Sequence, residues 1–186
     1  MNIEKVDILV VGAGPSGTMA AAIANKGGLN VKIIEKTKFP RFVIGESLLA
    51  RCMDHFEEAG VLEELNKHNF QVKNGAIFLK GEQRCEFDFS EQFTKGKAWT
   101  WQVPRDKFDK IIADQVESMG VAIDYESEVI DIKFNGTEST TIVKDKRGVE
   151  KKIEAKFIID ASGYGRVIPK LLDLLMSTSF PNKWEA

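Results

Sequence analysis

Hydrophobic residues near the start of the chain change from a strand pattern to a helix pattern and back. Residues 6–12 form an apolar run that predicts a buried strand. Residues from about 15 to 27 are rich in small and apolar side chains and end at a glycine pair, which predicts a helix. Residues 30–35 are again apolar and predict a second strand. Together these segments predict a βαβ unit over residues 5–35.

The middle of the chain does not continue this βαβ pattern. Apolar residues at helical spacing predict a helix from about Ser47 to Gly60 and a shorter helix over residues 61–67. Residues 70–103 alternate and carry many aromatic side chains, which predicts antiparallel strands. We therefore expect residues 36–103 to be an insertion between the second and third strands of a sheet.

A strong helix signal follows the insertion. Pro104 suits the first turn of a helix, and the apolar spacing carries this helix to Gly120. The rest of the chain predicts a short strand over 121–125, an antiparallel meander over 127–134, 139–145 and 149–156, and an apolar strand over 157–160.

Four short apolar strands are expected to form a parallel sheet: 6–12, 31–35, 121–125 and 157–160. Strands that alternate with helices are typical of doubly wound nucleotide-binding domains. The predicted fold class is therefore α/β, a Rossmann-like domain that also carries the meander and the inserted helical and β segment.

Three glycines lie between the first strand and the first helix, in Gly12-Ala-Gly-Pro-Ser-Gly17. Gly12 permits a tight turn, Gly14 lets the backbone approach a pyrophosphate, and Gly17 lets the helix pack closely on the sheet. The helix N-terminus offers free N–H groups and the positive end of its dipole. Because strand, helix and second strand follow in the required order, we predict a dinucleotide site and not an ordinary glycine turn.

The second strand ends at an acid, Glu35. A carboxylate at this position accepts hydrogen bonds from an adenosine ribose, and it suits the unphosphorylated ribose of FAD or NAD. It would repel a 2′-phosphate, although Lys36 and Lys38 could soften that repulsion. NADP is therefore disfavoured, and these residues do not separate FAD from NAD.

Composition narrows the function mainly by exclusion. The chain has 186 residues, is 43% hydrophobic and has a formal net charge of −2. It can bury a core and has no basic excess that would attract nucleic acid. It has no long apolar run suited to a membrane span, and its cysteines and histidines show no metal-binding or redox spacing. We expect a cytoplasmic protein with no metal site, no nucleic-acid partner and no stable membrane insertion.

Three further motifs accompany the glycine turn and Glu35. They are Phe39-Pro-Arg-Phe-Val-Ile-Gly-Glu-Ser47, Val103-Pro-Arg-Asp-Lys-Phe-Asp109 and Asp160-Ala-Ser-Gly163. In combination they resemble the flavoprotein family that contains flavin-dependent halogenases, aromatic hydroxylases of the p-hydroxybenzoate type and geranylgeranyl reductases. In that family the corresponding segments are a stretch beside the flavin, a helix start, and the turn after the last nucleotide-domain strand. The resemblance covers nearly the whole chain and implies that the dinucleotide is FAD.

The resemblance also implies a set of cofactor residues. Arg41 and Arg105 can neutralise a pyrophosphate or hold the ribityl chain, although both positions also suit solvated arginines. Asp160 equally suits a strand-end turn. The candidate cofactor residues are Gly12, Ala13, Gly14, Pro15, Ser16, Gly17, Glu35, Lys36, Arg41, Ser47, Arg105, Val129, Asp160, Ala161 and Gly163.

Members of this family are considerably longer than this chain. After the Asp-Ala-Ser-Gly turn they build a substrate-binding sheet and return with a second flavin motif. We therefore expect a portion of a larger enzyme. Residues 1–176 would form the FAD-binding domain, and residues 177–186 would begin a substrate-binding portion that is otherwise missing.

Lys73 is the candidate catalytic residue. In Val72-Lys-Asn-Gly-Ala-Ile-Phe78 it resembles the halogenase lysine that is proposed to hold or channel hypohalous acid. The alternative is a solvent-facing lysine on a strand. The segment from Trp99 to Pro104 looks like the halogenase W-x-W-x-I-P signature, but it precedes the Asp-Ala-Ser-Gly turn instead of following it. We interpret its tryptophans as buried strand residues.

The resemblance implies a FAD-dependent oxidoreductase of the halogenase or monooxygenase type, which uses reduced flavin and dioxygen on a small organic substrate. A flavin reductase or NAD(P)H would supply the electrons. One alternative is a geranylgeranyl-reductase-type enzyme that reduces isoprenoid double bonds. Another is a nucleotide-binding module without catalysis.

Overall fold

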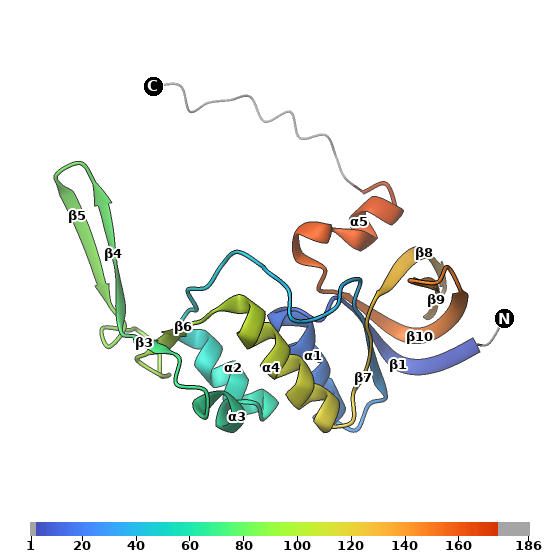
Figure 1. Ribbon diagram of the computed structural model, residues 1–186, viewed down its shortest axis with the longest axis horizontal. Coiled ribbons are helices and arrows are strands. Elements are labelled where there is room, and N and C mark those ends of the chain that lie inside the picture. The colour runs from blue at the N-terminus through green and yellow to red at the C-terminus, as the bar shows by residue number, and fades with distance from the viewer. Residues whose placement is uncertain (1–2, 175–186) are drawn as a thin grey trace.

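The computed structural model describes residues 3–174 (Figure 1). Its main sheet has six strands in the order β7-β2-β1-β10-β9-β8. The strands are β1 (Ile3–Val11), β2 (Val31–Ile34), β7 (Ala122–Asp124), β8 (Ser127–Asn135), β9 (Glu138–Asp145) and β10 (Glu150–Asp160). Strands β7, β2, β1 and β10 are parallel, and β9 and β8 continue the sheet as antiparallel strands. The predicted α/β class and its parallel sheet are confirmed.

The predicted βαβ unit is formed by β1, α1 (Pro15–Lys26) and β2. Leu9 and Val10 of β1 are fully buried, as are Ala21 and Ala22 of α1. The small side chains allow α1 to lie close against the sheet. The glycine turn between β1 and α1 therefore lies at the carboxyl end of β1, where α/β sheets bind nucleotides.

The meander differs from the prediction in one respect. Residues 149–156 and 157–160 were expected as two strands, but they form the single strand β10. One edge of β10 pairs with β9 and the other pairs with β1. No glycine or proline interrupts this stretch, so nothing ends the strand between its two pairings. The meander turns after β8 and β9 contain Gly136 and Gly148, which have φ of +68° and +83°.

The insertion contains two helices and four short strands. They are α2 (Arg51–Ala59), α3 (Leu62–Asn66), β3 (Gln71–Lys73), β4 (Gly75–Lys80), β5 (Gln83–Asp88) and β6 (Thr100–Gln102). β3 pairs with β6 and β4 pairs with β5, both antiparallel as predicted. The β4–β5 hairpin projects away from the body of the molecule (Figure 1).

The first helix of the insertion begins later than predicted, at Arg51 and not at Ser47. Ser47 forms a β-bridge with Gln102, and the N–H of Leu48 donates to the carbonyl of Trp101 over 3.1 Å. These bonds to β6 hold residues 46–48 extended, so the helix cannot start there. The segment that resembles the flavin-side stretch is thereby fixed to a strand.

The predicted helix after Pro104 is α4 (Arg105–Ser118). Phe108, Ile112 and Val116 are fully buried and contribute to the core that α4 shares with α1, α2 and the sheet. The Asp160-Ala-Ser-Gly163 turn leads into α5 (Val167–Leu171). Within residues 3–174 no helix is long and apolar enough to cross a membrane. The expected start of a further portion at 177–186 lies outside the described residues.

Candidate nucleotide site

The three glycines of the turn have different surroundings. Gly12 has φ of +102°, and a Cβ there would lie 2.7 Å from the carbonyl oxygen of Ala161. A Cβ on Gly17 would overlap the carbonyl oxygen of Gly12. A Cβ on Gly14 would instead meet no backbone atom and would make only an ordinary contact with the tip of Arg41, whose Nη2 would lie 3.6 Å away. Gly12 and Gly17 are thus required by the fold, whereas the bare face of Gly14 is available to a ligand.

Helix α1 directs its N-terminus at the same space. Pro15 occupies its first turn, and no acidic residue neutralises the positive end of the dipole there. The N–H groups of Ser16 and Gly17 belong to the first turn of the helix. N–H groups in the first turn of an α-helix have no carbonyl partner within the helix. Thr18 Oγ1 donates to the carbonyl of Gly14 over 3.0 Å and stabilises the start of the helix. Such a terminus is suited to binding a phosphate.

Glu35 closes the turn from the other side. The N–H of Ala13 donates to Glu35 Oε2 over 2.8 Å. The N–H and the hydroxyl of Thr37 donate to Oε1 over 2.8 and 2.6 Å. The side chain of Glu35 is 7% exposed and faces the cleft. A carboxylate has about four acceptor positions, so one remains for a ligand hydroxyl.

A cleft of about 360 Å³ lies beside these groups. Seven of the predicted cofactor residues line it: Gly12, Gly14, Glu35, Lys36, Arg41, Val129 and Ala161. Lys36 on the rim pairs with Glu128 at 2.7 Å. The cleft is therefore bounded by β1, β2, β8, the turn that follows β10, and α5.

Arg41 belongs to the loop 39–47 and lies where this loop faces the glycine turn. Its Nη2 is 3.9 Å from Glu35 Oε2 and 3.7 Å from Asp109 Oδ2, and its guanidinium carbon lies 4.7 Å from the centre of the Phe39 ring. Arg41 Nε is buried and has no hydrogen-bond partner among the described residues. An unsatisfied buried donor beside a bare glycine fits a bound diphosphate.

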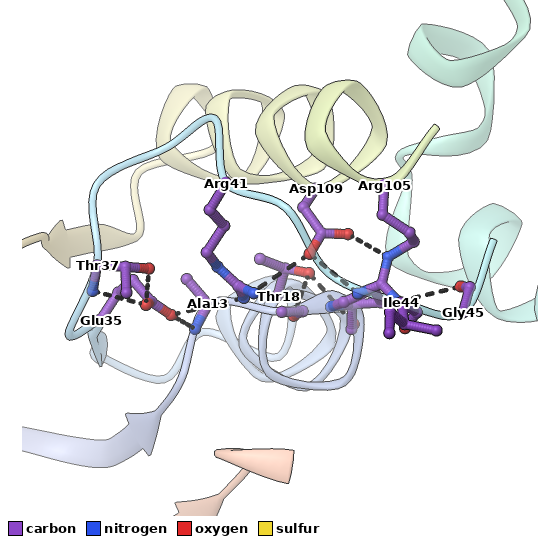
Figure 2. A network of polar contacts seen from close by, with 11 residues as sticks. Ala13, Thr18, Glu35, Thr37, Arg41, Ile44, Gly45, Arg105 and Asp109 are labelled. Atoms are coloured by element: carbon purple, nitrogen blue, oxygen red, sulfur yellow. Dashed lines mark hydrogen bonds and ion pairs between the residues drawn. The ribbon is translucent and has the colours of Figure 1, made fainter. Parts of the chain in front are cut away.

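Arg105 is held by Asp109, one helical turn further along α4 (Figure 2). Its Nε and Nη2 donate to the two carboxylate oxygens over 2.8 and 3.0 Å. Its Nη1 donates to the carbonyl of Gly45 over 3.1 Å. Arg105 thus joins α4 to the loop that leads to Ser47, and it does not line the cleft described above.

Lys73 and Ser47 are brought together by the pairing of β3 with β6. Lys73 Nζ donates to Ser47 Oγ over 2.6 Å and lies 5.2 Å from the centre of the Phe89 ring. The candidate catalytic lysine is therefore beside the segment that resembles the flavin-side stretch. It is half-buried and not freely solvated.

The Asp160-Ala-Ser-Gly163 turn shows a local structural use for Asp160. Its Oδ1 accepts from the N–H of Ser162 over 3.0 Å, and its Oδ2 accepts from the N–H of Ile168 over 2.9 Å. The carboxylate therefore fixes the turn and the start of α5. Gly163 has φ of +56° and also serves the turn. A role for either residue at the cofactor stays a prediction.

Asp109 and Thr37 are two site residues that we did not single out from the sequence. Asp109 is fully buried although it is charged. Its position, four residues after Arg105 and three before Ile112, places it on the apolar face of α4. The sequence signal that could have identified Asp109 was a carboxylate on the otherwise apolar face of this helix. Thr37 offered none, because its contact depends on how the chain turns after β2.

A bare glycine, a helix N-terminus and an acid at the end of the second strand lie around one cleft, and this arrangement is typical of a dinucleotide-binding α/β domain. Residues 5–181 match the FAD binding domain family, and the chain belongs to this family. Its cofactor is FAD, as the motifs predicted.

Relatives of the chain include flavin-dependent halogenases. A tryptophan 2-halogenase from Chondromyces crocatus is 33% identical over 162 residues, which cover 86% of this chain and 30% of that protein. A flavin-dependent halogenase from Armillaria mellea is 32% identical over 165 residues, which cover 86% and 32%. The chain thus spans about a third of the length of these curated relatives.

A crystal structure described as a flavoprotein/dehydrogenase from Cytophaga hutchinsonii has the same fold. It aligns with a TM-score of 0.86 at 58% sequence identity and covers 91% of this chain and 42% of that one. The predicted resemblance to halogenase-type flavoproteins is confirmed.

Proposed function

We propose that this chain is the FAD-binding part of a flavin-dependent oxidoreductase of the halogenase or monooxygenase type, acting on a small organic substrate. Bound FAD would supply the redox chemistry, with dioxygen as the oxidant. A separate flavin reductase or NAD(P)H would supply the electrons. The observation that carries the halogenase form is the 2.6 Å contact between Lys73 Nζ and Ser47 Oγ, beside the flavin-side segment.

The chain's own residues would divide the binding of FAD among them. The glycine turn and the first turn of α1 would hold the diphosphate, with Arg41 as its counter-charge. Glu35 would accept from the adenosine ribose. Ser47 and Arg105 would act on the flavin side, where Arg105 fixes the loop by its bond to Gly45.

Lys73 would position the oxidised halide. An ammonium group has three N–H donors, and the contact with Ser47 uses one of them. The other two can donate to hypohalous acid and hold it beside the substrate. Positioning of this kind raises the effective concentration of a reactant.

The experiment is a product analysis of the purified full-length protein. It is supplied with FAD, a flavin reductase, NADH, dioxygen and a panel of aromatic substrates, with and without bromide or chloride. Halogenated products that require halide are the expected result. If only hydroxylated products form, the protein is a monooxygenase and the proposed halogenase activity is wrong.

An isoprenoid substrate tests the alternative reductase. Consumption of its double bonds without dioxygen would favour the geranylgeranyl-reductase-type reaction. FAD binding without turnover of any substrate would favour a binding module.

A further inference from the structure

Two arginines approach the same buried carboxylate from its two sides (Figure 2). The side chain of Asp109 has no solvent exposure, whereas those of Arg105 and Arg41 are 13% and 23% exposed. Arg105 binds both carboxylate oxygens in the fork geometry that fixes a guanidinium plane. Arg41 Nη2 lies 3.7 Å from Oδ2, close enough for attraction and beyond a hydrogen bond.

A charged residue at position 109 is a poor choice for stability alone. It lies on the face of α4 that also buries Phe108 and Ile112. Burying an ion pair costs desolvation that roughly cancels the attraction, and apolar residues of similar size often serve a core equally well. The carboxylate therefore calls for another explanation, and its contacts supply one.

The two arginines lead to different parts of the site. Arg105 donates to the carbonyl of Gly45, two residues before Ser47. Arg41 lies against the open face of Gly14, and its Nε has no partner among the described residues. The contacts of Arg41 with the two carboxylates are longer than hydrogen bonds, so its N–H donors are available to a ligand. The attraction between its charge and these carboxylates still fixes its position.

We propose that Asp109 is a positioning residue for FAD, a buried anion that holds Arg41 at the diphosphate turn and Arg105 on the flavin-side loop. One carboxylate thereby couples the two ends of the cofactor site. The inference depends on FAD binding and not on the halogenation proposed above, so the two can fail separately.

The sign of one substitution separates positioning from simple electrostatics. Asp109→Asn keeps the shape of the side chain and removes its charge. If Asp109 only added negative charge near the diphosphate, its removal would tighten FAD binding. If it positions the arginines, its removal weakens FAD binding, by about tenfold for a lost charge-assisted hydrogen bond.

The same helix provides a matched control. Lys110 and Asp114 form an i,i+4 ion pair like Arg105 and Asp109, but their side chains are 42% and 52% exposed. Asp114→Asn makes the same chemical change to the same charge pattern, and it should leave FAD affinity unchanged.

The test uses purified full-length protein stripped of flavin and titrated with FAD, with affinity read from flavin fluorescence and apoprotein stability from thermal unfolding. The variants are D109N, D114N, Arg41→Gln and the double variant D109N with Arg41→Gln. We expect D109N to weaken FAD binding. We expect the double variant to bind FAD at most about twofold more weakly than the worse single variant, because D109N already displaces Arg41 and the second change then removes nothing further.

Binding by D109N that is as tight as wild type, or tighter, overturns the proposal. The proposal is also overturned if the fold-losses of FAD affinity in the two single variants multiply in the double variant. Such additivity in free energy would mean that the two changes damage the protein independently. If D109N does not fold, Arg105→Lys replaces it, because lysine keeps the charge and loses the fork. Weaker FAD binding by Arg105→Lys supports the proposal, and unchanged affinity overturns it.

Discussion

The backbone N–H of Ala13 donates to Glu35 Oε2 over 2.8 Å, across 22 residues of sequence. This bond ties the glycine turn to the end of β2. Glu35 therefore has two uses, because it shapes the turn and also presents the remaining acceptor to a ligand. Loss of the carboxylate should affect both.

Glu35→Gln is expected to lower both stability and FAD affinity. An amide has one acceptor oxygen, so either Ala13 or Thr37 loses its partner, and a buried unpaired donor costs about 1–3 kcal/mol of unfolding free energy. Denaturant unfolding of the apoprotein and FAD titration measure the two effects. Glu128→Gln, at the exposed rim pair with Lys36, is the control and should change stability by less than about 1 kcal/mol. A stable Glu35→Gln protein would show that the carboxylate does not hold the turn.

Gly14→Val is expected to abolish FAD binding and leave the fold intact. The new Cβ would contact the side chain of Arg41 and no backbone atom. The φ and ψ of Gly14 are −69° and 178°, an extended conformation that valine also adopts. We expect a stability loss of about 1 kcal/mol for the poorer N-cap. Circular dichroism and flavin absorbance after purification measure fold and occupancy.

Gly17→Ala provides the contrast. Its Cβ would overlap the carbonyl of Gly12, so this smaller substitution should destabilise the fold itself. Equal flavin occupancy in wild type and Gly14→Val would refute the assignment of Gly14 to the diphosphate.

Local features of the chain were enough to predict the parts of the fold that depend on short-range rules. The glycine spacing, the acid at position 35 and the proline before α4 each specify a backbone geometry within a few residues. The continuity of β10 could not be predicted in the same way. It depends on two partners, β1 and β9, that lie at very different distances along the sequence.

The contacts of the site were the least predictable feature. The bond between Lys73 and Ser47 exists because β3 and residues 46–48 both pair with β6. The attraction between Arg41 and Asp109 depends on where the loop 39–47 crosses α4. Both are tertiary relationships, and the motifs identified the residues without showing which of them meet.

Phe108→Ala is expected to destabilise the protein by about 3–5 kcal/mol. Phe108 is fully buried and makes edge contacts with Phe56 and Phe70, with ring centres 5.7 and 5.9 Å apart. The lost packing would loosen α4, which carries Arg105. Chemical denaturation measures the effect. Phe134→Ala, at a side chain 56% exposed on β8, is the control and should cost less than about 1 kcal/mol. Similar losses in both variants would contradict the core assignment.

Lys73→Ala tests the residue on which the halogenase form depends. Because Lys73 is half-buried and donates to Ser47, its removal should lower the unfolding free energy by about 1 kcal/mol, the contribution of one hydrogen bond. Halogenated product should be lost while FAD affinity and flavin oxidation stay unchanged, because Lys73 would act on the oxidised halide and not on the flavin. Lys80→Ala, at an exposed lysine on the end of β4, is the matched control and should retain full product yield. Unchanged halogenation by Lys73→Ala would return Lys73 to the role of a strand lysine, and the oxidised halide would then need another residue to hold it.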